Sequence, residues 1–176
     1  MELIELSQES SKVASEELAK KISHDFSYDL VIFIAKGSYT IGKELADYNN
    51  TELIEIKVAR KGNFIKEKLK IFLNILPKGI KNILRNIEIN SNVHDKMPKR
   101  KISFEENIWK RFINARKIII VDDSVDTGHS MKQCKETVEK FFKNSEIKVA
   151  ALNVFSKSEK IIKVDYYLYN DKLLQG

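Results

Sequence analysis

Cysteine is nearly absent from this sequence, and long apolar runs are absent altogether. The single cysteine, Cys134, excludes an internal disulfide and fits a reducing compartment such as the cytoplasm. No apolar run approaches the ~20 residues that a membrane-spanning helix requires, and the first residues lack the basic and then apolar layout of a signal peptide. We therefore expect a soluble cytoplasmic protein, and 176 residues suit one domain of ordinary size.

Internal repeats, low-complexity linkers and helix-turn-helix or winged-helix patterns are also missing, so we expect no nucleic-acid partner. The charge is nevertheless uneven. Residues 60–117 carry 16 Lys and Arg against 5 Asp and Glu, a net charge of +11, so the rest of the chain sums to −5. By charge alone, a segment this basic indicates an anionic partner, such as nucleic acid, a phosphorylated metabolite or an acidic membrane surface, or else a solvated helical face.

What the sequence does contain is an alternation of strand and helix patterns. Apolar, branched or alternating runs predict strands at 30–35, 52–59, 117–121, 147–155 and 164–169. Apolar residues at helical spacing predict helices at 14–22, 41–48 and 131–141, the last with Cys134 in its buried face. Alternation of this kind predicts an α/β fold, a Rossmann-like parallel sheet of about five strands flanked by helices.

One stretch interrupts the alternation. Residues 64–89 contain two amphipathic faces on either side of Pro77, which predict a helical hairpin, and a polar basic segment follows. We expect one domain over 1–176 that carries a basic helical insertion, or hood, at 60–115. The hairpin combines Leu, Ile and Phe with Lys, as interfacial helices do, so docking on a membrane or a partner is the alternative to packing on the sheet.

The most informative stretch is IIIVDDSVDTGHS, residues 118–130. The apolar run ends at Val121, and we expect Asp122 and Asp123 at the sheet edge where parallel strands present ligands. Adjacent carboxylates repel each other and require hydrogen-bond donors or a cation nearby, and vicinal ribose hydroxyls are such donors. Capping of the next helix and complementing its dipole is the structural alternative.

The turn that follows has the composition of a phosphate cradle. It contains Asp126, Thr127, Gly128, His129 and Ser130. Small residues and a glycine let successive backbone N–H groups converge on one point, and the start of a helix adds its positive dipole end there. Two side-chain hydroxyls add further donors, so the turn predicts a site for a phosphate monoester.

Residues 118–130 resemble the phosphoribosyl pyrophosphate signature of type I phosphoribosyltransferases. That signature is a hydrophobic strand, two acidic residues, three positions ending in Asp, and then Thr-Gly-x-Thr/Ser. The resemblance implies that Asp122 and Asp123 hold the ribose hydroxyls and contact Mg²⁺ only indirectly, through the ribose. It implies that residues 126–130 bind the 5-phosphate, and that Asp126 also acts as general base, as in purine-using members.

Two further stretches resemble the same family. VIFIAKGSYTIGKELA, residues 31–46, resembles the pyrophosphate loop, and the implied loop residues are Ala35, Lys36, Gly37 and Ser38, with Lys36 catalytic beside the leaving group. Residues 149–169 resemble the strand pair for base recognition. There Lys157 would contact an exocyclic oxygen and Tyr166 or Tyr167 would stack on the base. A surface lysine and ordinary sheet packing of the tyrosines are the alternatives.

The resemblances cover residues 29–59 and 116–170. They imply a phosphoribosyltransferase that uses phosphoribosyl pyrophosphate and Mg²⁺, releases pyrophosphate, pairs as a homodimer and takes a small-molecule acceptor, with hypoxanthine, guanine or xanthine as the default. Residues 60–115 depart from the family and resemble phosphoribosyltransferase-like proteins of bacterial surface-polysaccharide pathways, so a non-purine acceptor is an alternative. A non-catalytic regulator that binds phosphoribosyl pyrophosphate or a nucleotide is the remaining alternative.

Overall fold

The computed structural model describes residues 3–5, 7–35, 37–59 and 101–175. The chain divides into two compact units, one made of Met1–Val58 with Ile102–Gly176 and the other of Ala59–Lys101. The predicted helical hairpin lies outside the described residues. Residues 102–115, which the sequence assigned to the end of an insertion, belong to the first unit.

The first unit alternates strands and helices, as the apolar patterns predict. Its strands are β1 (Leu3–Glu5), β2 (Leu30–Ile34), β3 (Glu52–Ala59), β4 (Lys101–Ser103), β5 (Lys117–Val125), β6 (Glu146–Val154), β7 (Tyr166–Asn170) and β8 (Leu173–Gln175). Its helices are α1 (Gln8–Asp25), α2 (Tyr39–Asn49), α5 (Glu106–Arg111), α6 (His129–Phe141) and the 3₁₀ helix η2 (Ser156–Lys160).

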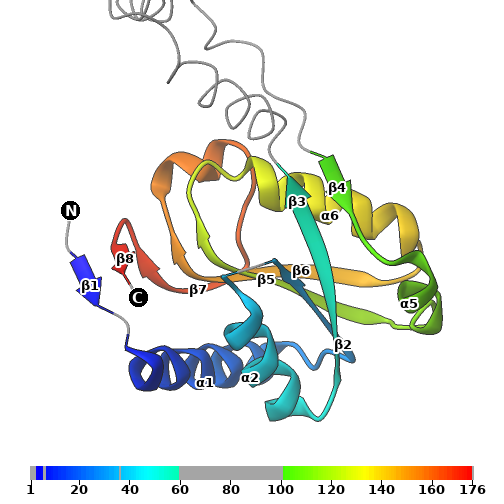
Figure 1. Ribbon diagram of the computed structural model, residues 1–176, viewed down its shortest axis with the longest axis horizontal. Helices are drawn as coiled ribbons and strands as arrows, with labels where there is room; N and C mark the ends of the chain where they lie inside the picture. The colour runs from blue at the N-terminus through cyan, green and yellow to red at the C-terminus, as the bar shows by residue number, and fades with distance from the viewer. Residues whose placement is uncertain (1–2, 6, 36, 60–100, 176) are drawn as a thin grey trace, which may run out of the picture. The chain divides into compact units, whose positions relative to one another are not determined.

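Six of these strands form one sheet in the order β4-β3-β2-β5-β6-β7 (Figure 1). The strand pairs β2–β3, β2–β5, β5–β6 and β6–β7 are parallel. This confirms the expected α/β fold, and the short strand β4 makes the sheet one strand wider than expected. Because parallel strands end at the same edge, the connections after β2, β5 and β6 are brought together there.

Helices cover both faces of the sheet. Helices α1 and α2 pack on one face, where Leu18 and Leu45 are fully buried, and α5 and α6 pack on the other. Alternate residues of one strand serve the two faces: Ile32 of β2 faces α5 and α6, whereas Val31 faces α1 and α2. Strands buried on both faces explain why their sequences are continuous apolar runs.

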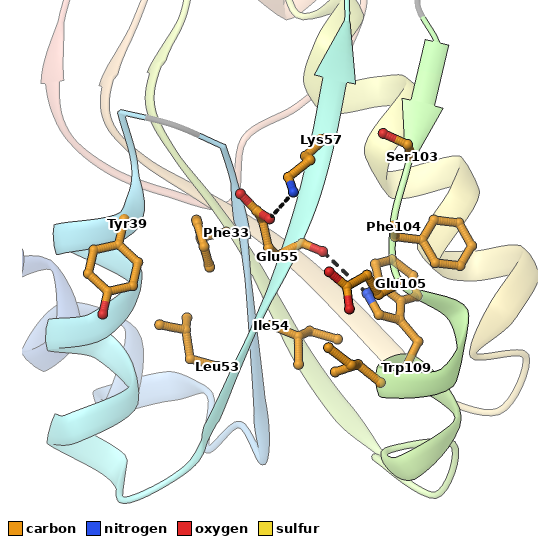
Figure 2. Close-up of a pocket in the computed structure, with 11 residues that line it drawn as sticks. Phe33, Tyr39, Leu53, Ile54, Glu55, Lys57, Ser103, Phe104, Glu105 and Trp109 are labelled. Atoms are coloured by element: carbon orange, nitrogen blue, oxygen red, sulfur yellow. Dashed lines mark hydrogen bonds and ion pairs between the residues drawn. The ribbon is translucent and has the colours of Figure 1, made fainter.

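The short helix α5 is attached to the sheet through Trp109. The Trp109 side chain is 1% exposed and stacks on Phe104, with ring centroids 4.1 Å apart. Its indole N–H donates to the backbone oxygen of Glu55 on β3, at 3.3 Å (Figure 2). This single tryptophan therefore fixes α5 against β3 by both packing and a hydrogen bond.

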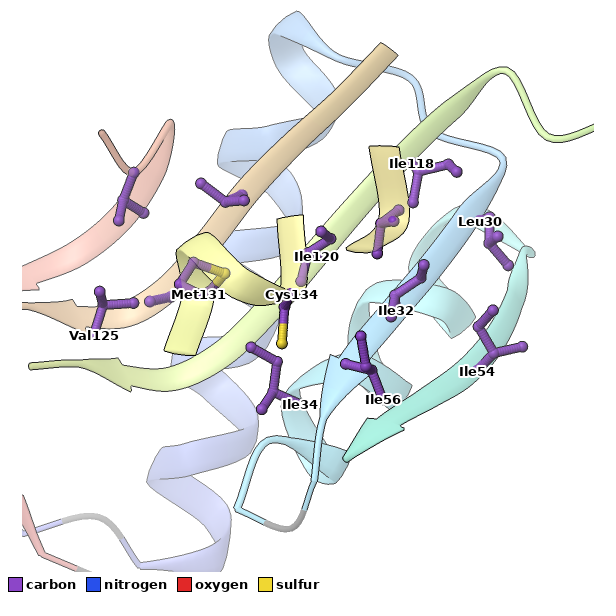
Figure 3. Packing of buried hydrophobic residues seen from close by; sticks show 14 of the residues in the cluster. Leu30, Ile32, Ile34, Ile54, Ile56, Ile118, Ile120, Val125, Met131 and Cys134 are labelled. Carbon is purple, nitrogen blue, oxygen red and sulfur yellow. The ribbon is translucent and has the colours of Figure 1, made fainter. Parts of the chain in front are cut away.

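The core on the α6 side consists mainly of branched aliphatic residues from four neighbouring strands (Figure 3). Met131 and Cys134 of α6 pack in the same cluster as Ile120 of β5, and Cys134 is fully buried. The prediction that Cys134 is a core residue is therefore confirmed. Phe142, one position beyond the end of α6, is also buried, with an exposed fraction of 1%.

The first and last strands form a separate two-stranded parallel sheet. Leu3 of β1 pairs with Leu173 of β8, and Ile4 pairs with Leu174. The two ends of the described chain are therefore held side by side (Figure 1). Among the described helices, none is long and apolar enough to cross a membrane.

Candidate functional site

Strand β5 extends further than the sequence indicated. It was expected to end at Val121, but its pairing with β6 continues to Val125. Asp122 and Asp123 therefore lie within the last part of the strand rather than in a loop. Sheet pairing with the apolar strand β6 overrides the low strand propensity of the polar residues. The connection to α6 is short, and α6 begins at His129 after Gly128.

The paired carboxylates are held by backbone hydrogen bonds within the strand. The Asp123 N–H donates to Asp122 Oδ1 at 3.0 Å, and the Ser124 N–H donates to Asp123 Oδ1 at 2.7 Å. Burial raises the pKa of Asp122 well above its ordinary value, and the negative charge of Asp123 raises it further. In the free protein, ionised Asp122 is thus poorly stabilised, as expected for a carboxylate that awaits donors or a cation.

The predicted phosphate turn caps the start of α6. Gly128 has φ 78°, in the left-handed region that favours glycine, and a Cβ there would lie 2.8 Å from Ile162 Cγ2. The turn therefore lies against η2 and the two residues that follow it. Asp126 and Thr127 are exposed, whereas His129 and Ser130 are half-buried. A polar turn at a helix N-terminus is able to bind an anion.

The predicted pyrophosphate loop lies against the paired carboxylates. Gly37, between β2 and α2, lies so close to Asp123 that a Cβ on Gly37 would overlap Asp123 Oδ2 and lie 3.1 Å from Asp123 Cγ. The Ala35 N–H donates to the Ile56 oxygen at 2.9 Å, and the buried Ser38 hydroxyl donates to the Ile34 oxygen. These bonds fix both ends of the loop, while Lys36 lies outside the described residues.

The residues predicted for base recognition lie on η2 and β7. Lys157 is exposed on η2, with its ammonium 5.1 Å from the centroid of the Phe155 ring. Tyr166 is 7% exposed in the core on the α1 side, and its hydroxyl accepts a hydrogen bond from Lys148 Nζ at 3.3 Å. Tyr167 is half-buried on the α6 side. Burial of Tyr166 favours the sheet-packing alternative for that residue, and roles for Lys157 and Tyr167 stay predictions.

Sequence reasoning missed two polar residues that join the segments around this site. Asn153 of β6 is fully buried and donates to the oxygen of Lys172 at 2.9 Å. Asp171, with φ 53°, accepts hydrogen bonds from the backbone N–H and the hydroxyl of Ser156 at the start of η2. The signal for Asn153 was present, because an amide inside the apolar run AALNVF requires buried partners.

A cavity of about 500 Å³ lies elsewhere, along β3 (Figure 2). Phe33, Tyr39 and Leu53 line one part of it, and Phe104 and Trp109 line another. None of the carboxylates or loop residues predicted to bind substrate is among its lining residues. The cavity is therefore distinct from the candidate site, although Tyr39 directly follows the Gly37–Ser38 loop.

The candidate site does not contain a ready-made metal cage. Within the described residues, no group of three or more His, Cys, Asp and Glu side chains is arranged to hold a metal ion. The oxygen donors of Asp122 and Asp123 nevertheless suit Mg²⁺, which is commonly bound by one or two carboxylates together with substrate phosphates. The arrangement is chemically able to bind a phosphorylated, hydroxyl-rich ligand with its own cation.

Comparison with known proteins agrees with this geometry at the level of the fold. No family model and no curated protein matches the sequence. Among solved structures, a purine phosphoribosyltransferase from Pyrococcus horikoshii Ot3 is 19% identical, with a TM-score of 0.66 over 99% of this chain and 92% of that one. The Helicobacter pylori xanthine-guanine-hypoxanthine phosphoribosyltransferase is 14% identical, with a TM-score of 0.62 over 97% and 90%.

A third similar structure is a hypothetical protein from Neisseria gonorrhoeae with bound ppGpp. It is 14% identical, with a TM-score of 0.66 over 99% of this chain and 87% of that one. These likenesses show that the chain has the fold of type I phosphoribosyltransferases, which confirms the fold implied by the resemblance of residues 118–130 and 31–46.

Proposed function

We propose that this chain transfers the phosphoribosyl group of phosphoribosyl pyrophosphate to a purine base and releases pyrophosphate. The contact between Gly37 and Asp123 carries the proposal. It joins a loop suited to pyrophosphate to carboxylates suited to ribose, and these segments lie far apart in the sequence. The phosphate turn at the start of α6 follows the same strand, so the three parts of one ligand have neighbouring sites.

The bound sugar would be held from both ends. Its 2- and 3-hydroxyls would donate to Asp122 and Asp123, and its 5-phosphate would accept from backbone N–H groups of the turn and from the hydroxyls of Thr127 and Ser130. Hydroxyl donors would stabilise ionised Asp122, whose pKa is raised in the free protein. Binding energy from these groups would position C1 for reaction.

In the reaction, the bond from C1 to the pyrophosphate oxygen breaks and a bond from a base nitrogen to C1 forms. The transition state resembles an oxocarbenium ion, so positioning and charge stabilisation supply most of the catalysis. Asp126 would accept the proton that the base nitrogen loses. Lys36 would balance the negative charge that develops on the departing pyrophosphate.

Mg²⁺ would enter with the substrate. It would reach Asp122 and Asp123 only indirectly, through the ribose oxygens that these carboxylates hold, and its preference for oxygen ligands would be met by diphosphate and ribose oxygens. When bound, the ion neutralises charge on the pyrophosphate leaving group. The protein's own residues would orient the sugar and hold the proton acceptor.

The test is pyrophosphate release from phosphoribosyl pyrophosphate with hypoxanthine, guanine, xanthine or adenine. The double variant Asp122→Asn with Asp123→Asn should lower kcat/KM by about 100-fold to 10,000-fold, because hydrogen bonds to charged groups contribute about 1.5–3 kcal/mol each. A matched control is Asp25→Asn with Asp47→Asn, which removes two exposed carboxylates on α1 and α2. Equal turnover of wild type and the first double variant would rule out the ribose assignment.

A nucleotide-binding regulator is the second candidate, because one protein of similar fold is described with bound ppGpp. Calorimetry with phosphoribosyl pyrophosphate and with guanine nucleotides, run beside the release assay, separates the candidates. Binding without turnover on any acceptor supports the regulator. Release of pyrophosphate only with acceptors other than purines supports the surface-polysaccharide alternative.

A further inference from the structure

Asn153 is a buried amide in a strand that is otherwise apolar. Its side chain is fully buried, and its neighbours Leu152 and Val154 are buried hydrophobic residues. Burying an amide is costly unless its donors and acceptor are paired. The hydrogen-bond partners of Asn153 therefore indicate its role.

The first partner is the backbone of Lys172, in the turn between β7 and β8. The Lys172 N–H donates to Asn153 Oδ1 at 3.2 Å, and Asn153 Nδ2 donates to the Lys172 oxygen at 2.9 Å. A backbone N–H only donates and a carbonyl only accepts. The orientation of the Asn153 amide is therefore set by Lys172, and its second N–H is directed elsewhere.

The second partner is Ser124, which pairs with Asn153 across β5 and β6. Asn153 Nδ2 is 3.5 Å from Ser124 Oγ, and Ser124 Oγ donates to Asp126 Oδ1 at 3.3 Å. Because Asn153 approaches Ser124 with a donor, the hydroxyl proton of Ser124 is free to point toward Asp126. The polarity of the chain of hydrogen bonds thus runs from Lys172 through Asn153 and Ser124 to the Asp126 carboxylate.

We propose that Asn153 is a positioning residue for Asp126 and acts through the hydroxyl of Ser124. The inference rests on the proposed function, in which Asp126 accepts a proton from the acceptor base. With Oδ1 held by Ser124, Oδ2 is left to face the acceptor. The same amide holds the β7–β8 turn, where Asp171 binds Ser156 at the start of η2, so one residue fixes segments on two sides of the site.

If Asn153 had only a structural role, its hydrogen bonds with Lys172 would be the ones that matter. Variants of Ser124 therefore distinguish this structural role from the positioning of Asp126. Ser124→Ala removes the link to Asp126 but leaves both bonds between Asn153 and Lys172. Ser124→Thr keeps the hydroxyl. Ser145→Ala is the matched control, because Ser145 is also half-buried and its hydroxyl donates to the Ala115 oxygen at 2.5 Å.

The measurement is the χ1 rotamer population of Asp126 from three-bond NMR couplings. Wild type, Ser124→Thr and Ser145→Ala should show one dominant rotamer, and Ser124→Ala should show averaging. Asn153→Asp should also show averaging, since its carboxylate would accept the Ser124 proton and leave Asp126 without a donor. A single Asp126 rotamer in Ser124→Ala would overturn the proposal.

Asn153→Asp buries a charge and is at risk of not folding, so a second measurement uses the native amide. One side-chain amide proton of Asn153 should change its chemical shift in Ser124→Ala and stay unchanged in Ser145→Ala. No change in Ser124→Ala would show that Asn153 does not reach Ser124 and would overturn the proposal.

The kinetic counterpart is a fall in kcat of about 2-fold to 10-fold for Ser124→Ala, with the KM for phosphoribosyl pyrophosphate unchanged and the loss restored in Ser124→Thr. A rise in the KM for phosphoribosyl pyrophosphate with kcat unchanged would contradict positioning of the proton acceptor. The NMR measurements need no turnover. If the Asp126 rotamers average in Ser124→Ala while the wild type releases no pyrophosphate with any acceptor, the link from Ser124 to Asp126 stands and the proposed function is refuted.

Discussion

Two aspartates near the candidate site have pKa shifts of opposite sign, and their surroundings explain the difference. Burial and the charge of Asp123 raise the pKa of Asp122. The hydroxyl and backbone N–H of Ser156 lower the pKa of exposed Asp171, with a smaller contribution from the charge of Lys157. The folded structure thus stabilises the ionised form of Asp171 and disfavours that of Asp122.

Asp122→Asn should therefore stabilise the free protein at neutral pH. A carboxyl whose pKa is higher in the folded state loses stability as pH rises above its unfolded value of about 3.9. Removing the charge abolishes that loss, while Asn Oδ1 still accepts the Asp123 N–H. We expect a rise in Tm of a few degrees at pH 7, given about 2–4 °C per kcal/mol for a chain of this size, and no difference near pH 3.

Thermal unfolding followed by circular dichroism from pH 3 to pH 8 is the measurement. The matched control is Asp171→Asn, which should lower Tm at pH 7, because the lowered pKa of Asp171 contributes stability that is present above its unfolded value and lost in acid. A lower Tm for Asp122→Asn at neutral pH would contradict the role of burial at that residue.

At the scale of the element, the β2–α2 segment contains two glycines that serve different purposes. Gly37 lies in the loop against Asp123, whereas Gly42 lies in α2, where a Cβ would be 2.9 Å from Phe33 Cβ and 3.0 Å from Leu53 Cδ1. The first close approach is to the carboxylate of an exposed side chain, and the second is to the packed core. Gly37 is thus a site residue and Gly42 a packing residue.

Gly37→Ala should displace the Asp123 carboxylate and weaken binding of phosphoribosyl pyrophosphate about 10-fold or more, with Tm changed by no more than about 2 °C. Gly42→Ala should lower the free energy of unfolding by about 1–3 kcal/mol, the usual cost of overpacking, through strain between α2 and β2. Calorimetric titration and chemical denaturation of both variants are the measurements. Loss of stability in Gly37→Ala with unchanged affinity would reverse the assignment.

The longer elements could be predicted from the sequence because each carries its own pattern. Strand β3 was predicted with its observed bounds, and β2, β6 and the three long helices follow from their apolar residues. Asp122, Asp123 and the 126–130 turn could be identified from residue types and order alone. That they lie close to Gly37 could not be derived from the residues themselves. It was only an expectation from the fold class, because parallel strands place separate loops at one edge of the sheet.

The short elements could not be predicted, for a physical reason. Strands β1, β4 and β8 contain three residues each and α5 contains six, which is too few to show a period. Their stability comes from tertiary contacts, such as the pairing of β1 with β8 and the burial of Trp109 against β3. The extension of β5 through Asp122–Val125 was hidden in the same way, because polar residues there are held in the strand by pairing with β6.

At the scale of the whole molecule, the sheet brings together segments that are distant in the sequence. Helices cover both faces of the sheet, and the polar groups of the candidate site collect at the carboxyl edge of the strands. The phosphate turn, the carboxylates and the Gly37 loop are connected to β2, β5 and α6, which are central elements of the fold. A ligand that bridges them should therefore stabilise the folded state as a unit.

Phosphoribosyl pyrophosphate with Mg²⁺ should raise the Tm of the wild type. At 100 times its Kd a ligand that binds only the folded state contributes about 2.7 kcal/mol, which corresponds to about 5–11 °C here. Trp109, the single tryptophan, is buried, and it reports unfolding by a red shift of its emission.

The chain carries a net charge of +6, so polyanions are also expected to bind it nonspecifically, and inorganic triphosphate with Mg²⁺ at equal concentration is the necessary control. A specific site predicts a larger shift with the ribose ligand than with triphosphate, and this excess should vanish in the Asp122→Asn, Asp123→Asn double variant. Equal shifts for both ligands would mean that charge alone is responsible and that the carboxylates hold no sugar.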